Sequence, residues 1–308
     1  MASNYWTSSH YQRWQSVHPT RLLNENKADL ERGILTATDI TVLHAFFARH
    51  LFQFGREIDS KEKTTSFHVP LRQRVIATAI VYYRRVYLNA SFEEFNPLDV
   101  CPAVIMLAAK CEECHGRMRL LSMLERWREF IRLVQPQLGN LQDTTTVEAQ
   151  RLRVVKLEYA ILVKLEFDLI IYHPFRPLLT YGEHNTMKPL VPVALSILND
   201  CYMGKDTLYM SHEPYLLALA ALVATACWHS PKKSENLDWF RDLMHVELDK
   251  VLDLARQLTV QYNEQPLQLS PEVWERLQRV LLQKAAIPAN AEGEDRPNGS
   301  SHKRKLEA

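Results

Sequence analysis

The sequence predicts an all-α protein built from two similar helical domains in tandem. Apolar residues recur at helical spacing along most of the 308 residues, and no sustained alternation of apolar and polar residues indicates a strand. Two segments, residues 98–109 and 215–227, are apolar on every side. That pattern is typical of a helix surrounded by other helices. Each segment begins just after a proline, Pro97 or Pro214.

An amphipathic helix precedes each of these segments at the same distance. Ile76 and Ile80 lie as far before Pro97 as Val193 and Ile197 lie before Pro214, so the order of helices repeats although residue identity does not. The expected division is an N-terminal helix segment over 1–37, a first domain over 38–170, a second domain with a final helix over 171–286, and a disordered tail over 287–308.

Caps and breakers bound the individual helices. Thr38 or Asp39 can cap the first one, which should end near Gly55, and Pro70 opens the second. Ser270 followed by a proline and an acidic residue starts the last helix. We expect helices over 39–54, 70–86, 98–109, 117–134, 147–169, 214–227 and 271–284, and two more between 236 and 262. We expect loops over 56–69 and 135–146, and a proline-stiffened linker over 172–177.

Composition excludes several functional classes. Lys and Arg number 37 against 36 Asp and Glu, so no net charge recruits nucleic acid or a membrane surface. The eight glycines are too scattered to form a phosphate-binding loop. The N-terminus shows no secretion signal and the longest apolar run is too short to span a bilayer. We therefore expect an intracellular protein without direct contact to nucleic acid or membrane.

The string Cys111-Glu-Glu-Cys114-His115 has the spacing that attaches c-type haem. Attachment needs an oxidising export route, which the sequence does not indicate. Zinc would need a further pair of ligands with suitable spacing, and none follows. We interpret the two cysteines as reduced thiols at a helix end, with a haem or redox protein as an alternative. No hydrolase motif is present, so the sequence predicts no catalytic residue, cofactor or metal.

Two charged residues stand in apolar surroundings. Lys110 follows directly on the apolar segment 98–109, and Glu158 shares a helix face with Val154 and Ile161. Burying either charge alone would cost roughly several kcal/mol of folding free energy, so each charge needs a partner of opposite charge or a hydrogen-bonding group. Either the two form an internal salt bridge, or they are held ready on an apolar surface for another protein. Spacing alone leaves both interpretations open.

Several strings resemble the cyclins, whose cyclin box is a five-helix bundle carried twice. The apolar helix ends Leu-Ala-Ala-Lys-X-Glu-Glu at 107–113, and a later helix carries Glu158 and then Leu-Glu-Phe-Asp-Leu at 165–169. Within the cyclins, residues 4–14, 71–79 and 171–178 resemble the cyclin C family. The resemblance covers about residues 4–265.

The resemblance implies a regulatory subunit and not an enzyme. Cyclin C activates the cyclin-dependent kinase of the Mediator kinase module, which regulates RNA polymerase II transcription in the nucleus. The resemblance implies that Lys110 and Glu158 hydrogen-bond the αC region of the kinase. It implies that Phe167 and Leu169 pack on the same kinase helix. It further implies that Glu113 faces arginines of the kinase activation loop. Expected partners are that kinase and the other subunits of the module.

The N-terminal segment would add family-specific kinase contacts through Tyr5, Trp6 and Trp14, the alternative being a helix that only caps the first domain. The Met-Arg-Ala-Ile-Leu patch with which cell-cycle cyclins dock substrates is absent, so we expect no substrate docking there. The basic run 302–305 is either a nuclear import signal or a solvated charge cluster. A transcription-factor-IIB-like adaptor that acts without a kinase is the alternative function.

Overall fold

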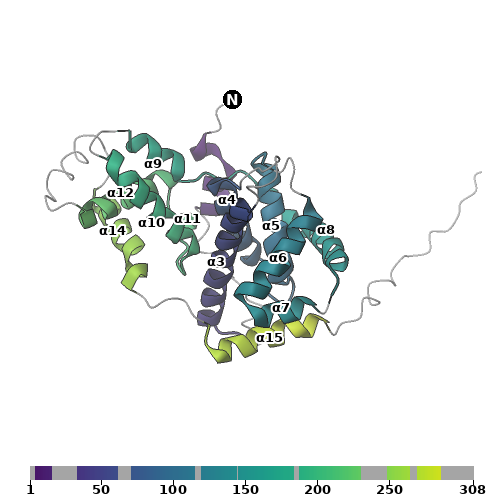
Figure 1. Ribbon diagram of the computed structural model, residues 1–308. Helices are drawn as coiled ribbons and strands as arrows, with labels where there is room; N and C mark the ends of the chain where they lie inside the picture. The colour runs from purple at the N-terminus through teal and green to yellow at the C-terminus, as the bar shows by residue number, and fades with distance from the viewer. Residues whose placement is uncertain are drawn as a thin grey trace, which may run out of the picture.

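The computed structural model describes residues 4–15, 33–61, 71–114, 119–143, 145–183, 187–229, 248–263 and 269–285. Within these ranges the chain is helical and contains no β-strand, as predicted (Figure 1). None of the helices in this part of the chain is long and apolar enough to cross a membrane.

The first bundle is built around one central helix. It comprises α3 (Ala37–Lys61), α4 (Gln73–Tyr87), α5 (Pro97–Cys111), α6 (Leu120–Val134), α7 (Pro136–Asp143) and α8 (Val147–Lys164). Helix α5 contacts α3, α4, α6 and α8, and its residues 97–109 are all buried. This enclosure explains why the sequence of α5 is apolar on every side.

The second bundle repeats this arrangement around α12. It comprises α9 (Phe175–Tyr181), η3 (Lys188–Leu190), α10 (Val191–Met203), α11 (Leu208–Ser211), α12 (Pro214–His229), α14 (Leu248–Val260) and η4 (Gln261–Asn263). Helix α12 contacts α9, α10 and α14. Pro97 and Pro214 are the first residues of α5 and α12, and α4 and α10 precede them, so the predicted repeat of helix order is confirmed.

Helix α3 does not end near Gly55 as predicted but continues to Lys61. The glycine serves helix packing instead. A Cβ atom at Gly55 would lie 2.7 Å from Cγ1 of Ile76 on α4, so the missing side chain lets the two helices approach closely. The N-terminal cap is Thr36 and not Thr38 or Asp39 as predicted. Thr36 Oγ1 accepts from Asp39 N at 3.2 Å, and Asp39 Oδ2 accepts from Thr36 N at 2.9 Å.

Further boundaries differ from the prediction: α4 begins at Gln73 and not at Pro70, and α9 begins at Phe175 inside the expected linker. Residues 136–143 form α7 instead of a loop: Pro136 suits the first helical position, and close packing of Gly139 on α6 outweighs the low helix propensity of glycine. Helix α8 ends at Lys164 and not at Leu169, since the next residues turn into the left-handed region. The expected tail over 287–308, including the basic run, lies outside the described residues, as do 236–247 and 62–69.

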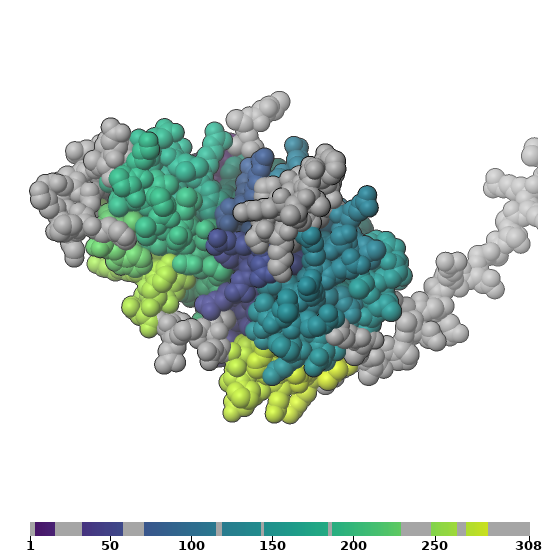
Figure 2. All heavy atoms as spheres, viewed as in Figure 1, coloured from purple at the N-terminus to yellow at the C-terminus, as the bar shows by residue number. Residues whose placement is uncertain are grey.

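The last helix, α15 (Pro271–Ala285), starts at the predicted proline but packs on the first bundle. The ring of Trp274 lies 5.6 Å from that of Phe46, and Arg276 pairs with Asp39 of α3 at 3.0 Å. Figure 2 shows α15 along the lower edge of the first bundle. The chain therefore crosses back from the second bundle to the first.

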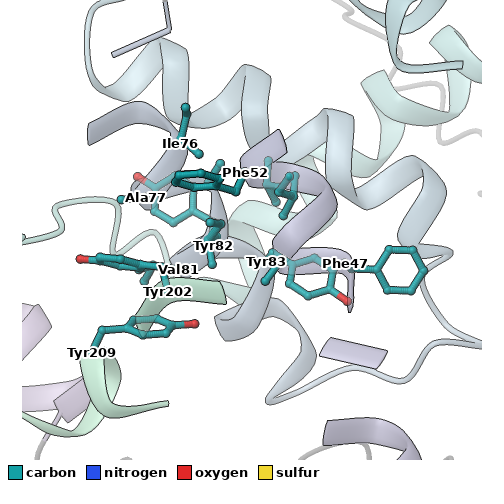
Figure 3. Close-up of a cluster of buried hydrophobic side chains, with 14 of the residues drawn as sticks. Phe47, Phe52, Ile76, Ala77, Val81, Tyr82, Tyr83, Tyr202 and Tyr209 are labelled. Atoms are coloured by element: carbon teal, nitrogen blue, oxygen red, sulfur yellow. The ribbon is translucent and has the colours of Figure 1, made fainter. Parts of the chain in front are cut away.

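A buried polar chain joins the two bundles. Thr78 on α4 lies 2.8 Å from Nε2 of His173, whose Nδ1 lies 2.7 Å from the hydroxyl of Tyr202 on α10. Apolar contacts surround it: Figure 3 shows Val81 of α4 beside Tyr202 and Tyr209, whose rings are 4.6 Å apart. These interactions fix one bundle against the other.

We expect Gly55→Ala to lower the free energy of unfolding by about 1–3 kcal/mol, because the added methyl group overlaps Ile76. Denaturant unfolding measures this change. In an Ile76→Ala background the same substitution should be neutral or stabilising, because the obstacle is gone and alanine favours the helix. An equal loss in both backgrounds would contradict the packing explanation.

Stability should also depend on pH through His173. Burial, with the nearby Arg74 and Arg85 charges, lowers the pKa of His173 from 6.5 to about 3. Between these values the unfolded chain binds a proton and the folded chain does not, so the free energy of unfolding falls as pH drops, by up to about 1.4 kcal/mol per pH unit. His173→Gln should reduce this slope in urea titrations between pH 7 and 5. Tyr202→Phe, which breaks the same chain but leaves the imidazole, should retain the slope, and equal slopes in wild type and His173→Gln would contradict the assignment.

Candidate protein-docking site

Lys110 and Glu158 meet where the central helix reaches the surface. Lys110 lies in the last turn of α5, where a cation is favoured by the helix dipole, and its Nζ donates to Oε1 of Glu158 on α8. Their side chains remain 43% and 29% exposed. The internal salt bridge therefore forms, and both groups are still accessible to another molecule.

One face of α8 packs inward as predicted. Val154 and Ile161 are buried, and Leu165 at the helix end is fully enclosed. Another side of α8 carries an exposed apolar stripe that was not predicted from the sequence. The stripe consists of Leu152 (52% exposed), Val155 (47%), Tyr159 (68%) and Val163 (48%).

These four positions are spaced by three or four residues, so they form a second row along the helix. This spacing could have predicted the exposed row from the sequence, because it places apolar residues on a second side of α8. Glu158 follows Val155 by three residues, so the ion pair lies at the edge of this row. An exposed apolar row with an ion pair at its edge is typical of a protein-docking site.

Helix α8 ends in a tight turn that places the Phe167 side chain in solvent. Glu166 N donates to Val163 O and Phe167 N to Leu162 O, both at 3.0 Å, which is the Schellman pattern. The left-handed position holds Glu166 (φ 54) where glycine is usual, and Phe167 (φ 58) is left-handed as well. Each such residue costs about 1–2 kcal/mol. Phe167 is 58% exposed, whereas Leu169 is half-buried against the core.

Helix α5 ends in the same way and separates its two glutamates. Glu113 (φ 54) is exposed in the left-handed position, with its N donating to Lys110 O at 3.2 Å and Cys114 N to Ala109 O at 2.8 Å. Glu112 turns inward, where it pairs with Arg74 and accepts from Thr78 Oγ1 at 2.9 Å. Glu113 is thus the acid presented to solvent.

The N-terminal aromatics divide into surface and interior. Trp6 is exposed and packs edge-on against Tyr11 at 5.0 Å, while Tyr5 is half-buried beside Tyr172. Trp14 is only 2% exposed. The expectation that Trp14 offers a surface contact therefore does not hold in this structure, because its indole is buried against Arg85 of α4 and donates to Asp168.

The cysteine string shows free thiols. Cys111 is exposed at the end of α5, and Cys114 is half-buried with its Sγ donating to Glu112 O at 3.2 Å. His115 lies outside the described residues. Within the part of the chain that the structure describes, no group of three or more His, Cys, Asp or Glu side chains is placed to hold a metal ion.

No protein-family model matches the chain. Comparison with whole proteins does find relatives. Cyclin-C of Rattus norvegicus is 29% identical over 304 residues, which covers 98% of both chains. Cyclin-C of Drosophila pseudoobscura pseudoobscura is 30% identical and covers 85% of this chain and 90% of its own. Cyclin-C1-1 of Oryza sativa is 29% identical and covers 84% and 88%.

Solved structures agree on the fold. A chain of the CAK complex of Chaetomium thermophilum aligns with TM-score 0.62 at 16% identity, covering 96% of this chain and 98% of its own. A chain of the yeast TFIIK (Kin28/Ccl1/Tfb3) complex aligns with TM-score 0.55 at 18% identity, covering 83% and 99%.

The two repeated helical bundles have the architecture of the cyclin box, and together with the cyclin C relatives they indicate a regulatory subunit rather than a kinase. Identity along nearly the whole chain is more specific than the fold. This chain belongs to the cyclin C family.

We expect Lys110→Ala and Glu158→Ala each to change the free energy of unfolding by less than about 1 kcal/mol, because the ion pair is partly solvated and exposed pairs contribute little. Thermal unfolding at low and high salt measures the change. Losses several times larger would show instead that the pair mainly holds α5 and α8 together.

Proposed function

We propose that this chain is the activating cyclin subunit of the cyclin-dependent kinase in the Mediator kinase module, and that it regulates RNA polymerase II transcription in the nucleus. The observation that carries the proposal is the exposed apolar stripe of α8 beside the accessible Lys110–Glu158 pair. Similarity to cyclin C proteins along nearly the full chain supports it.

The proposed mechanism is positional. An apolar partner helix such as the kinase αC would lie along the stripe, whose large side chains lose water on binding. Lys110 and Glu158 supply a donor and an acceptor for the polar groups at the end of that helix. Pinning αC inward allows the β3 lysine and αC glutamate of a kinase to pair and align ATP.

The remaining site residues have supporting roles in this proposal. Phe167 extends the apolar surface beyond the end of α8, and the half-buried Leu169 would pack on the same kinase helix. Glu113 offers an exposed carboxylate to arginines of the kinase activation loop. Tyr5 and Trp6 would contact the kinase from the N-terminal segment. The docking site thus lies in the first domain, over residues 38–170. The second domain follows over 171–286.

The test is direct. The purified chain is mixed with the Mediator cyclin-dependent kinase of the same organism, and co-elution is measured together with phosphorylation of a polymerase C-terminal repeat peptide. We expect a one-to-one complex with raised activity. Binding to a different cyclin-dependent kinase alone would overturn the Mediator assignment, and salt-dependent DNA binding without any kinase complex would favour the adaptor alternative.

Tyr159→Ala should weaken kinase binding at least tenfold, on the order of 1.4 kcal/mol or more, because a central exposed aromatic in a docking surface carries a large share of the affinity. Glu158→Ala should also weaken it. Tyr262→Ala and Glu275→Ala remove an exposed tyrosine and an exposed glutamate outside this surface and should bind normally. Equal losses in all four variants would contradict the proposed location.

A further inference from the structure

The N-terminal segment holds the turn that follows α8. Trp14 and Arg13 lie in η2 (His10–Gln15), and both donate to the buried carboxylate of Asp168. Trp14 Nε1 donates to Oδ2 at 2.9 Å, and Arg13 pairs with Oδ1. A carboxylate inside the protein is tolerated only with such partners, so the contact is built and not incidental.

Asp168 directly follows the two left-handed residues Glu166 and Phe167. Its own N donates to Leu165 O at 2.9 Å, and its carbonyl accepts from Arg85 at 3.4 Å. Both the side chain and the backbone of Asp168 are therefore anchored. Consecutive left-handed residues other than glycine persist only where the surroundings determine their conformation.

Further contacts hold the N-terminal segment in this place, one to α4 and two to the segment that follows α8. The guanidinium of Arg85 lies 4.5 Å over the ring of Trp14, and Arg13 also lies 3.7 Å from the carboxylate of Glu166. Tyr172 N donates to Nδ1 of the buried His10 at 3.0 Å. The N-terminal segment thus clamps residues 166–172 from one side.

We propose that Trp14 and Arg13 are positioning residues that act through Asp168 to fix the left-handed turn and so hold Phe167 in its exposed orientation for docking. The inference rests on the proposed function, because Phe167 is placed in the kinase-docking surface there. It gives the buried Trp14 a role in docking without a contact to the partner.

The first test needs no kinase. Hydrogen exchange of the amides of residues 166–168 is compared in wild type, Trp14→Phe and Trp127→Phe. The control is matched, since Trp127 is a buried tryptophan of the first bundle whose Nε1 donates to Leu98 O at 3.0 Å. We expect exchange at 166–168 to be about tenfold faster in Trp14→Phe only, because the donor to a charged acceptor is lost. Equal exchange in the two variants would overturn the proposal.

Arg13→Gln provides a variant that should fold normally, because the Arg13 side chain is half-exposed. It should accelerate exchange at the same amides by a smaller factor. No change there in Arg13→Gln, together with none in Trp14→Phe, would show that the turn holds itself.

The second test is a double-mutant cycle on kinase affinity. Trp14→Phe should weaken binding several-fold when Phe167 is present and should add nothing in a Phe167→Ala background, because the effect passes through that side chain. An equal loss in both backgrounds would overturn the role in docking. If the wild-type chain binds no kinase, the proposed function fails, while the exchange experiment still decides whether the N-terminal segment holds the turn.

Discussion

The enclosure of α5 is the constraint on which the rest of the first bundle depends. Four helices contact it, and its residues 97–109 are withdrawn from water. A charged residue on such a helix needs either a partner inside the fold, as the buried Asp99 has in Arg153 of α8, or a position where the helix emerges into solvent. The emergence point is Lys110, and the neighbouring helix supplies Glu158 at the same place. The candidate docking site therefore lies where the central helix reaches solvent.

Packing against α5 also determines what α8 exposes. Helix α8 has apolar residues on two faces and can bury only one of them. Val154 and Ile161 are used for the core, which leaves the row containing Tyr159 in water. Exposing a row of large apolar side chains is unfavourable for an isolated protein, and a partner that covers it removes that cost.

Both helices of this surface end with a glutamate in a conformation that favours glycine. Glu113 and Glu166 occupy equivalent positions after α5 and α8. In each case the backbone closes the helix normally while a carboxylate replaces the glycine. At α8 the strain extends to Phe167, and the buried Asp168 with its N-terminal partners lies directly behind that turn. A segment far away in sequence is thereby linked to the shape of the surface.

The helical class, the repeat of helix order and Lys110 with Glu158 as a candidate pair follow from the amino-acid sequence alone. Pro97 and Pro214, each followed by an all-apolar run, were enough to find the two central helices, because a helix apolar on every side has no stable place except the interior. Lys110 and Glu158 were recognisable because charges in apolar surroundings need partners.

Other features depend on contacts that form only in the folded chain. Gly55 and the segment 136–143 look like breakers, yet close helix packing makes the glycine useful and outweighs the low propensity of α7. The left-handed turns at Glu113 and Glu166 could not be predicted, because glutamate disfavours that conformation and contacts elsewhere in the fold enforce it. Which apolar face of α8 is buried, and that Trp14 reaches Asp168, depends on contacts between residues distant in sequence, which local spacing does not encode.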